Sequence, residues 1–170
     1  MAHHIELNPV SHYTIGAIGK PGKRTFYLQG KRDEQVISLL IEKEQARLLA
    51  GSLFSLWDEL MNTHPILADQ PGTAVYDMRL IEPIEPLFRV GNMGLGYDEL
   101  TDRVVLMVYE LVEEDEEPNR VSFWCARSYI QPLSEHIMEV VNRGRPICGN
   151  CGKPIDPDGH FCPQSNGHAK

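Results

Sequence analysis

The feature that most constrains the fold is a strand that runs directly into a helix, between residues 36 and 60. Residues 36–41 are mostly apolar and rich in β-formers, and from residue 42 onward the apolar residues recur at helical spacing. The same pattern returns 84 residues later without a gap, so that Ser38 corresponds to Ser122 and Leu49 to Leu133. Self-similarity of this kind predicts a duplicated unit.

Each strand–helix unit is preceded by segments that predict two further strands. These strands are residues 12–18 and 25–29 in the first half, and residues 87–94 and 103–111 in the second. Each half therefore has the order β-β-β-α, and antiparallel hairpins with one buried face need a helix to cover it. We expect an α+β fold over residues 1–146, in which two tandem βββα repeats form an antiparallel sheet or barrel about a pseudo-twofold axis, covered by two helices.

Local signals also predict where several elements begin and end. Leu87 to Gly94 resembles Tyr13 to Gly19, which would make these segments equivalent first strands. Pro132 suits the first turn of the second helix, where its missing N–H group costs nothing. Residues 1–11 are expected to be a poorly ordered lead-in, and residues 75–80 a short edge strand within a linker.

The C-terminal residues 147–170 predict a small metal-binding tail. A pair of cysteines separated by two residues forms a tight knuckle in which both sulfurs face one tetrahedral cation. The candidate ligands are Cys148, Cys151, Cys162 and either His160 or His168. Three thiolates with one imidazole suit zinc in a structural site, with iron as a chemical competitor.

A second candidate is an anion site at the start of the first helix. Arg24 and Lys43 are predicted to lie at a strand end and at this helix start, and Lys43 corresponds to Arg127 in the second half. Because a helix N-terminus attracts anions, these residues predict binding of a phosphorylated small molecule or nucleotide. The alternative is a solvated helix start with local ion pairs, which is the norm for surface charges.

Composition excludes several classes of function. The net charge of −8 opposes nucleic acid and anionic lipid, which leaves RNA binding through the locally basic tail as a weaker alternative. The chain contains no apolar run long enough to cross a membrane, and because its first residues hold no apolar segment, we do not expect a signal peptide. Three of its four cysteines lie in the tail, which favours a reducing cytoplasm over a disulfide framework. Cys125 lies in an apolar strand and is expected to be a core residue.

Three motifs together span most of the chain. They are Gly16-x-x-Gly19-x-Pro21-Gly22-x-Arg24-Thr25-Phe26-Tyr27-Leu28-Gln29, then Glu42-Lys43-x-Gln45, and the tail motif from Gly144 to Gly167 that holds Cys148, Cys151, His160 and Cys162. In combination they resemble the bacterial family known as domain of unknown function 3090 (DUF3090). The resemblance implies that His160 is the fourth metal ligand, because position 168 is a weaker part of the family's pattern.

The resemblance implies little about activity, because the family has none established. Its members are often encoded beside a histidine-phosphatase-like protein and a lipid-kinase-like protein, which implies a protein partner. We therefore expect a zinc-containing, non-enzymatic binding or adaptor protein. The alternative is an enzyme or binding protein for a phosphorylated small molecule or nucleotide, which a deep polar pocket between the halves would favour.

Overall fold

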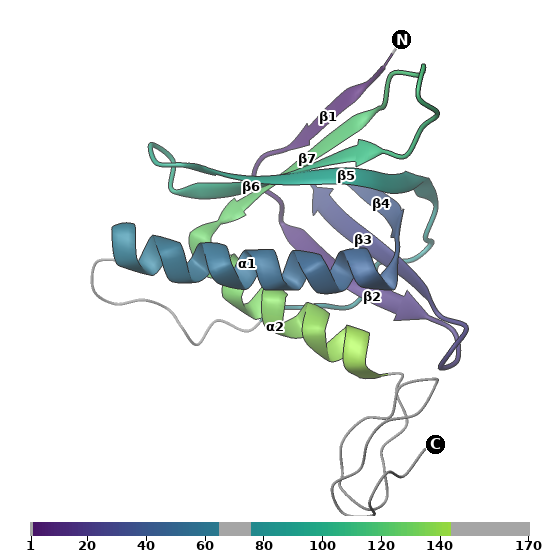
Figure 1. Cartoon of the computed structure of the whole chain (residues 1–170), viewed down its shortest axis with the longest axis horizontal. Coiled ribbons are helices and arrows are strands. Elements are labelled where there is room, and N and C mark those ends of the chain that lie inside the picture. The colour runs from purple at the N-terminus through teal and green to yellow at the C-terminus, as the bar shows by residue number, and fades with distance from the viewer. Residues whose placement is uncertain (1, 65–75, 144–170) are drawn as a thin grey trace, which may run out of the picture.

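The computed structural model describes residues 2–64 and 76–143. The predicted zinc ligands Cys148, Cys151, His160, Cys162 and His168 lie outside the described residues. In the described part, seven strands form one mixed sheet in the order β1-β7-β6-β5-β4-β3-β2, and two helices pack beside it (Figure 1). The elements are β1 (His4–Leu7), β2 (His12–Ile18), β3 (Thr25–Arg32), β4 (Gln35–Ile41), α1 (Lys43–Thr63), β5 (Pro86–Asp98), β6 (Arg103–Glu110), β7 (Arg120–Ala126) and α2 (Arg127–Arg143).

The α+β class is confirmed, and β2–α1 and β5–α2 each follow the order βββα. The prediction of an antiparallel sheet or barrel is wrong in two respects. β4 and β5 are parallel, because the crossover through α1 returns the chain to the end of the sheet from which β4 started. Strand pairing within the described residues also does not close the sheet into a barrel. The turn between β1 and β2 nevertheless contacts both β7 and β3, because Val10 N donates to Trp124 O (2.8 Å) and Ser11 N donates to Lys31 O (2.7 Å).

Strand β1 replaces the poorly ordered lead-in expected for residues 1–11. It pairs in parallel with β7, with Ile5 opposite Val121 and Leu7 opposite Phe123. Leu7 is fully buried. The partner strand lies more than 100 residues away in the sequence, so local composition alone could not reveal this pairing.

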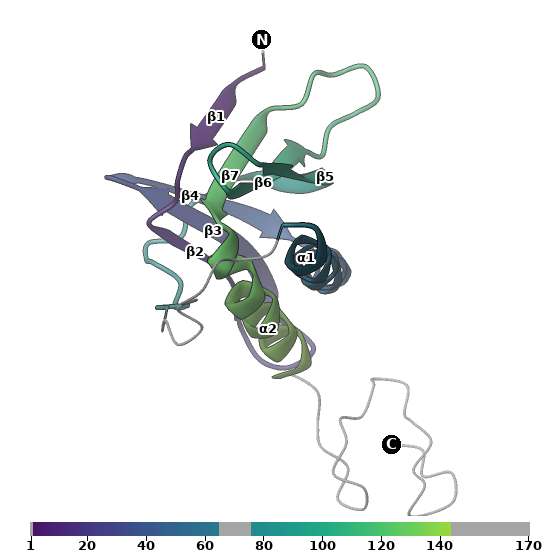
Figure 2. The ribbon, with the colours of Figure 1, turned by 90° about the vertical axis from the view of Figure 1, so that its left-hand side faces the viewer.

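The sheet curves so that β2 and β3 face β7 across the core, with both helices on one side of the strands (Figure 2). The rings of Tyr13 and Phe123 stack with centroids 5.5 Å apart. Gly30 of β3 makes this approach possible, because a Cβ atom there would lie 2.5 Å from a ring carbon of Phe123. The core therefore depends on glycine, which has no side chain, at position 30 of β3.

The two helices cross in contact through residues that are 84 positions apart. The hydroxyl of Ser134 donates to the carbonyl oxygen of Ala50 at 2.8 Å. The buried residues of the two helices correspond at the same offset, as Leu49 with Leu133 and Leu53 with Ile137. This correspondence agrees with the repeat seen in the sequence, while a common origin of the two halves stays a prediction.

The ladder of strand pairs corrects the expected equivalence of the first strands. Ile15 lies opposite Leu28, and Leu95 lies opposite Leu106. Leu28 and Leu106 in turn pair with Leu39 and Phe123, which are 84 residues apart. The segment from Tyr13 therefore corresponds to β5 from Met93 onward, because the first residues of this long strand precede the matching part and pair with β4.

Helix α2 begins earlier than Pro132 predicts. It starts at Arg127, which places the proline inside the helix. Tertiary contacts hold the additional turn, because Ile130 is fully buried and the hydroxyl of Tyr129 donates to the carbonyl oxygen of Tyr13 at 2.8 Å. Packing in this case overrides the preference of proline for the first turn.

Residues 76–85, which we call the strap, cover the outer face of β2, β3 and β4. Three cross-strand neighbours, Thr14, Gln29 and Ser38, form a buried polar row beneath them. The amide of Gln29 bonds both backbone groups of Ile81, at 2.7 and 3.0 Å, and Thr14 Oγ1 donates to Met78 O at 2.8 Å. The expected strand at 75–80 is absent over its described residues, because side chains rather than a neighbouring strand take these hydrogen bonds.

Substitution of Gly30 tests the close approach of β3 to β7. Gly30→Ala should lower the free energy of unfolding by about 1–3 kcal/mol, because the buried Phe123 ring must move to make room. Urea denaturation measures the change. The control is Gly51→Ala, where a Cβ atom meets nothing within 4 Å and helix propensity should add about 0.5–1 kcal/mol. Equal stability of Gly30→Ala and wild type would contradict this account of the core.

Candidate functional site

Strand β5 extends well beyond the strand that it pairs with on one side. β4 contacts it at only two register positions, Ser38 opposite Pro86 and Leu40 opposite Arg89. β6 pairs with the other side of β5 as far as Asp98. Within the described residues, 92–98 therefore have a strand neighbour on one edge only, and helix α1 lies along the other edge.

Polar contacts tie α1 to the β5–β6 hairpin near both ends of the helix. Near its start, Gln45 Nε2 donates to the carbonyl oxygens of Val90 and Gly91, both at 3.1 Å. Near its end, the buried guanidinium of Arg127 donates to the carbonyl oxygens of Leu60 and His64. Hydrogen bonds therefore hold α1 near both of its ends, while its middle part is separated from β5 by the space described below.

The same guanidinium also holds the tip of the β5–β6 hairpin. Arg127 Nε donates to Asp102 Oδ1 at 2.9 Å, and the Tyr97 hydroxyl donates to the same oxygen at 2.6 Å. Its Cζ atom lies 5.7 Å from the centre of the Tyr97 ring. Arg127 thus joins the C-terminus of α1, the start of α2 and the hairpin tip in one cluster.

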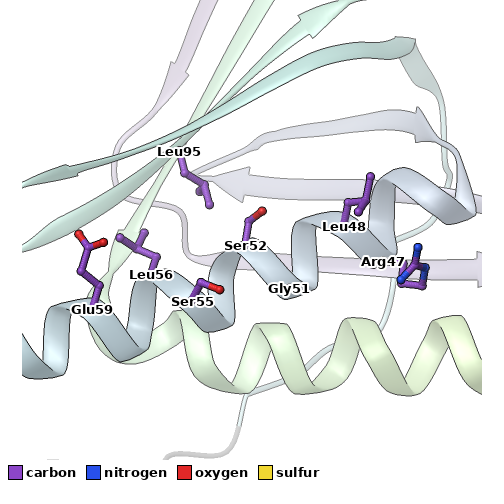
Figure 3. Close-up of a pocket in the computed structure, with 8 residues that line it drawn as sticks. All are labelled: Arg47, Leu48, Gly51, Ser52, Ser55, Leu56, Glu59 and Leu95. Atoms are coloured by element: carbon purple, nitrogen blue, oxygen red, sulfur yellow. The ribbon is translucent and has the colours of Figure 1, made fainter.

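A groove opens between α1 and β5 along the stretch that lies between these anchors. Its inner part has a volume of about 350 Å³ and reaches down to Leu49, Met93 and Leu106. A shallower part of about 580 Å³ continues along the helix past Ser55 to Glu59. Both parts share Leu48, Ser52 and Leu95, and Leu95 points from β5 towards the helix (Figure 3). We call the whole the α1–β5 groove.

Helix α2 and strand β2 occupy the equivalent position in the other half, and there the helix contacts the strand edge directly. His136 Nε2 lies 3.0 Å from the carbonyl oxygen of Ile15, and the Tyr129 hydroxyl bonds that of Tyr13. At the 84-residue offset, His136 corresponds to Ser52. The α1–β5 groove therefore exists where a serine stands in place of a histidine that reaches the strand.

The groove combines apolar walls with small polar groups and a strand edge. Leu48, although apolar, is 58% exposed beside it, whereas Leu106 at its base is 1% exposed. Ser52 and Ser55 supply hydroxyl groups, and the ionisable side chains on its rim are Arg47 and Glu59. Arg47 is already paired with Glu44. This arrangement suits the binding of apolar side chains and of an extended backbone.

The three residues predicted to bind an anion do not meet in one site. Arg24 Nη1 donates to Val140 O (2.8 Å) and Nη2 to Val141 O (3.3 Å), so the side chain caps the C-terminus of α2. Burial, with Arg143 nearby, lowers the pKa of Arg24. Lys43 begins α1 and Arg127 lies at its end, and a helix of 21 residues is about 30 Å long. One small ligand cannot bridge Lys43 and Arg127, whereas an anion site formed by Arg24 and Lys43 at the start of α1 stays a prediction.

Other candidate chemical groups have structural roles. Cys125 is a core residue, as predicted, and its burial raises the pKa of the thiol to about 12. Over residues 2–64 and 76–143, no three His, Cys, Asp or Glu side chains gather in a way that could hold a metal ion. Neither described helix has the length and apolar character needed to cross a membrane.

Sequence reasoning missed the α1–β5 groove, although a signal for it was present. Small residues, Gly51, Ser52 and Ser55, interrupt the side of α1 between Leu48 and Leu56. A comparison of the two halves at the 84-residue offset places His136 against Ser52 and Glu139 against Ser55. Because α1 has short side chains where α2 has long ones, a groove is expected beside α1 and not beside α2.

Comparison with known proteins identifies the family. Residues 5–162 match the family described as "Protein of unknown function (DUF3090)". The match covers nearly the whole chain, so the chain belongs to this family, as the three motifs predicted. Searches of curated proteins and of solved structures give no significant match.

The contact of His136 with β2 predicts a pH dependence of stability. Burial lowers the pKa of His136, so the unfolded state takes up the proton more readily. Its contribution to the free energy of unfolding is therefore complete above the unfolded pKa of about 6.5 and declines as the pH falls below it. His136→Gln can still donate to Ile15 O and should remove this part of the slope. Urea denaturation between about pH 7.5 and 5 compares the two proteins, and parallel curves would contradict the assignment.

Proposed function

We propose that this member of the DUF3090 family is a non-enzymatic binding protein that takes part of a protein partner into the α1–β5 groove. The observation that carries the proposal is an apolar groove along the edge of β5, where the described part of the chain places a neighbouring strand on one side only. Exposed apolar side chains gathered at a groove are typical of protein–protein contact sites.

The character of the groove favours binding over catalysis. Its base is formed by Leu95 and Leu106, and the hydroxyl groups nearest to it belong to Ser52 and Ser55 on the exposed side of α1. A nucleophilic serine needs a base within hydrogen-bond reach, and the ionisable groups on the rim are a paired arginine and Glu59. The groove can therefore bind a partner through apolar contacts and hydrogen bonds, without catalysing a reaction on it.

We also propose that residues 147–170 bind zinc through Cys148, Cys151, Cys162 and His160. The spacing of the cysteines supports tetrahedral thiolate coordination. The family match supports His160 over His168, because it ends at Cys162 and so includes the first histidine but not the second. Four protein ligands make this a structural site, which would fix a small tail beside the binding core.

Site-specific photocrosslinking tests the groove as the binding surface. A photoreactive phenylalanine analogue in place of Leu48 should form a discrete adduct with one protein in living cells, because this side chain is 58% exposed inside the groove. The matched control is the same replacement at Leu100, which is 96% exposed on the turn between β5 and β6. Histidine-phosphatase-like and lipid-kinase-like proteins are the first candidates for the adduct. Equal or absent crosslinking at the two positions would refute the proposal.

Metal analysis tests the tail. Protein purified without chelator should carry about one zinc per chain, and acidification should release it, because thiolates must be deprotonated to bind. His160→Ala should lose zinc more readily than His168→Ala, and Cys125→Ala is the control that leaves the metal content unchanged, since Cys125 is buried in the core. Protein that contains neither zinc nor iron, with Cys148 and Cys151 free, would exclude the site.

A further inference from the structure

We infer that the occupant of the α1–β5 groove is an extended segment of a partner protein, which adds to the edge of β5 as a further strand and carries basic residues at one end. This inference rests on the proposed binding function and specifies the partner's chemistry. Three observations carry it: the open strand edge, the apolar base of the groove, and the uneven distribution of charge along it.

The first observation concerns the backbone of β5. In an antiparallel pair, alternate residues direct their N–H and C=O groups away from the partner strand, so part of residues 92–98 must direct these groups away from β6. In the other half, the corresponding carbonyl oxygens of Tyr13 and Ile15 are bonded by Tyr129 and His136. The ladder makes Leu95 the equivalent of Ile15, and Ser52 is too short to repeat the histidine's contact. The backbone of an added strand would satisfy these groups.

The second observation concerns the base of the groove. Leu95 of β5 forms it with Leu106, and Leu48 and Leu56 line the groove from α1 (Figure 3). Successive side chains of a strand point to opposite sides, so every second side chain of an added strand would enter the groove and the others would face solvent. The ligand should therefore have apolar side chains at alternate positions over about six residues, which is the usual length of a strand.

The third observation concerns charge along the groove. At the end nearer the C-terminus of α1, Asp58, Glu59 and Glu99 are exposed carboxylates, and the helix dipole adds negative potential. Of the basic groups at this end, Arg127 is 7% exposed and already bonded to Asp102, and His64 Nε2 lies 3.6 Å from Glu99 Oε2. Glu59 is therefore the carboxylate on the groove rim without a basic neighbour among the described contacts. At the other end, Arg47 and Arg89 are each paired with a glutamate. Charge complementarity places lysine or arginine of the partner beside Glu59.

Selection from a displayed library of random heptapeptides tests the inference, with the full-length protein immobilised. The selected peptides should alternate apolar and polar residues and carry lysine or arginine at one end. Fluorescence polarisation with a labelled selected peptide should show binding at least about tenfold weaker for Ser52→His, which introduces the side chain of the other half, and for Leu48→Asp on the exposed rim. Glu59→Lys should remove the preference for a basic end.

The controls separate this inference from the proposed function. Glu139→Lys reverses an exposed charge on α2, away from the groove, and should leave binding within about twofold of wild type. Thermal unfolding of each variant identifies any loss of fold. If Ser52→His is unstable, the peptide affinity of Leu48→Asp tests the inference instead. A crosslink at position 48 together with selected peptides that lack alternation or a basic end would overturn the inference and leave the binding function standing. Absence of selected peptides would also overturn it, whereas absence of the crosslink would count against the function itself.

Discussion

β4 and β5 are hydrogen-bonded neighbours only near Ser38 and Leu40, and beyond that point the edge of β5 needs another cover. Helix α1 contacts this edge, and α2 contacts the edge of β2 in the same way, so each helix packs against the first strand of the other half. Gln45 of α1 bonds the carbonyl oxygens of Val90 and Gly91 next to the bulge in β5, and Tyr129 of α2 bonds that of Tyr13 in β2. In each half, the edge of the first strand is therefore contacted by the helix of the other half, and these contacts join the two halves into one core.

The two helices bury side chains at equivalent positions, but they differ in how their outer side chains contact the neighbouring strand. Leu49 and Leu133 occupy equivalent buried positions, as do Leu53 and Ile137. The difference lies at the margin of the interface, where His136 closes the contact with β2 and Ser52 leaves a groove beside β5. A groove can arise in this way while the buried positions that the two helices share stay the same.

The sequence predicted what depends on local periodicity and missed what depends on distant partners. The apolar spacing of residues 46–60 identified α1 because a helix presents its buried side chains at regular intervals. It could not show that β1 pairs with β7, or that Gly30 admits the Phe123 ring, because both depend on a segment far away in the chain. The charge of Arg24 is visible in the sequence, whereas the end of α2 that it caps becomes apparent only in the fold.

The pairing of β1 with β7 has a consequence for the order of events during synthesis. Strand β1 cannot take its place in the sheet until β7 has been synthesised, because its partner is encoded more than 100 residues later. Until then Leu7 and the Tyr13 ring lack the Phe123 ring against which they pack in the finished core. Long-range pairing of this kind delays completion of a fold and prolongs the exposure of strand edges. A nascent chain that lacks β7 therefore leaves core residues of its earlier half without their packing partners.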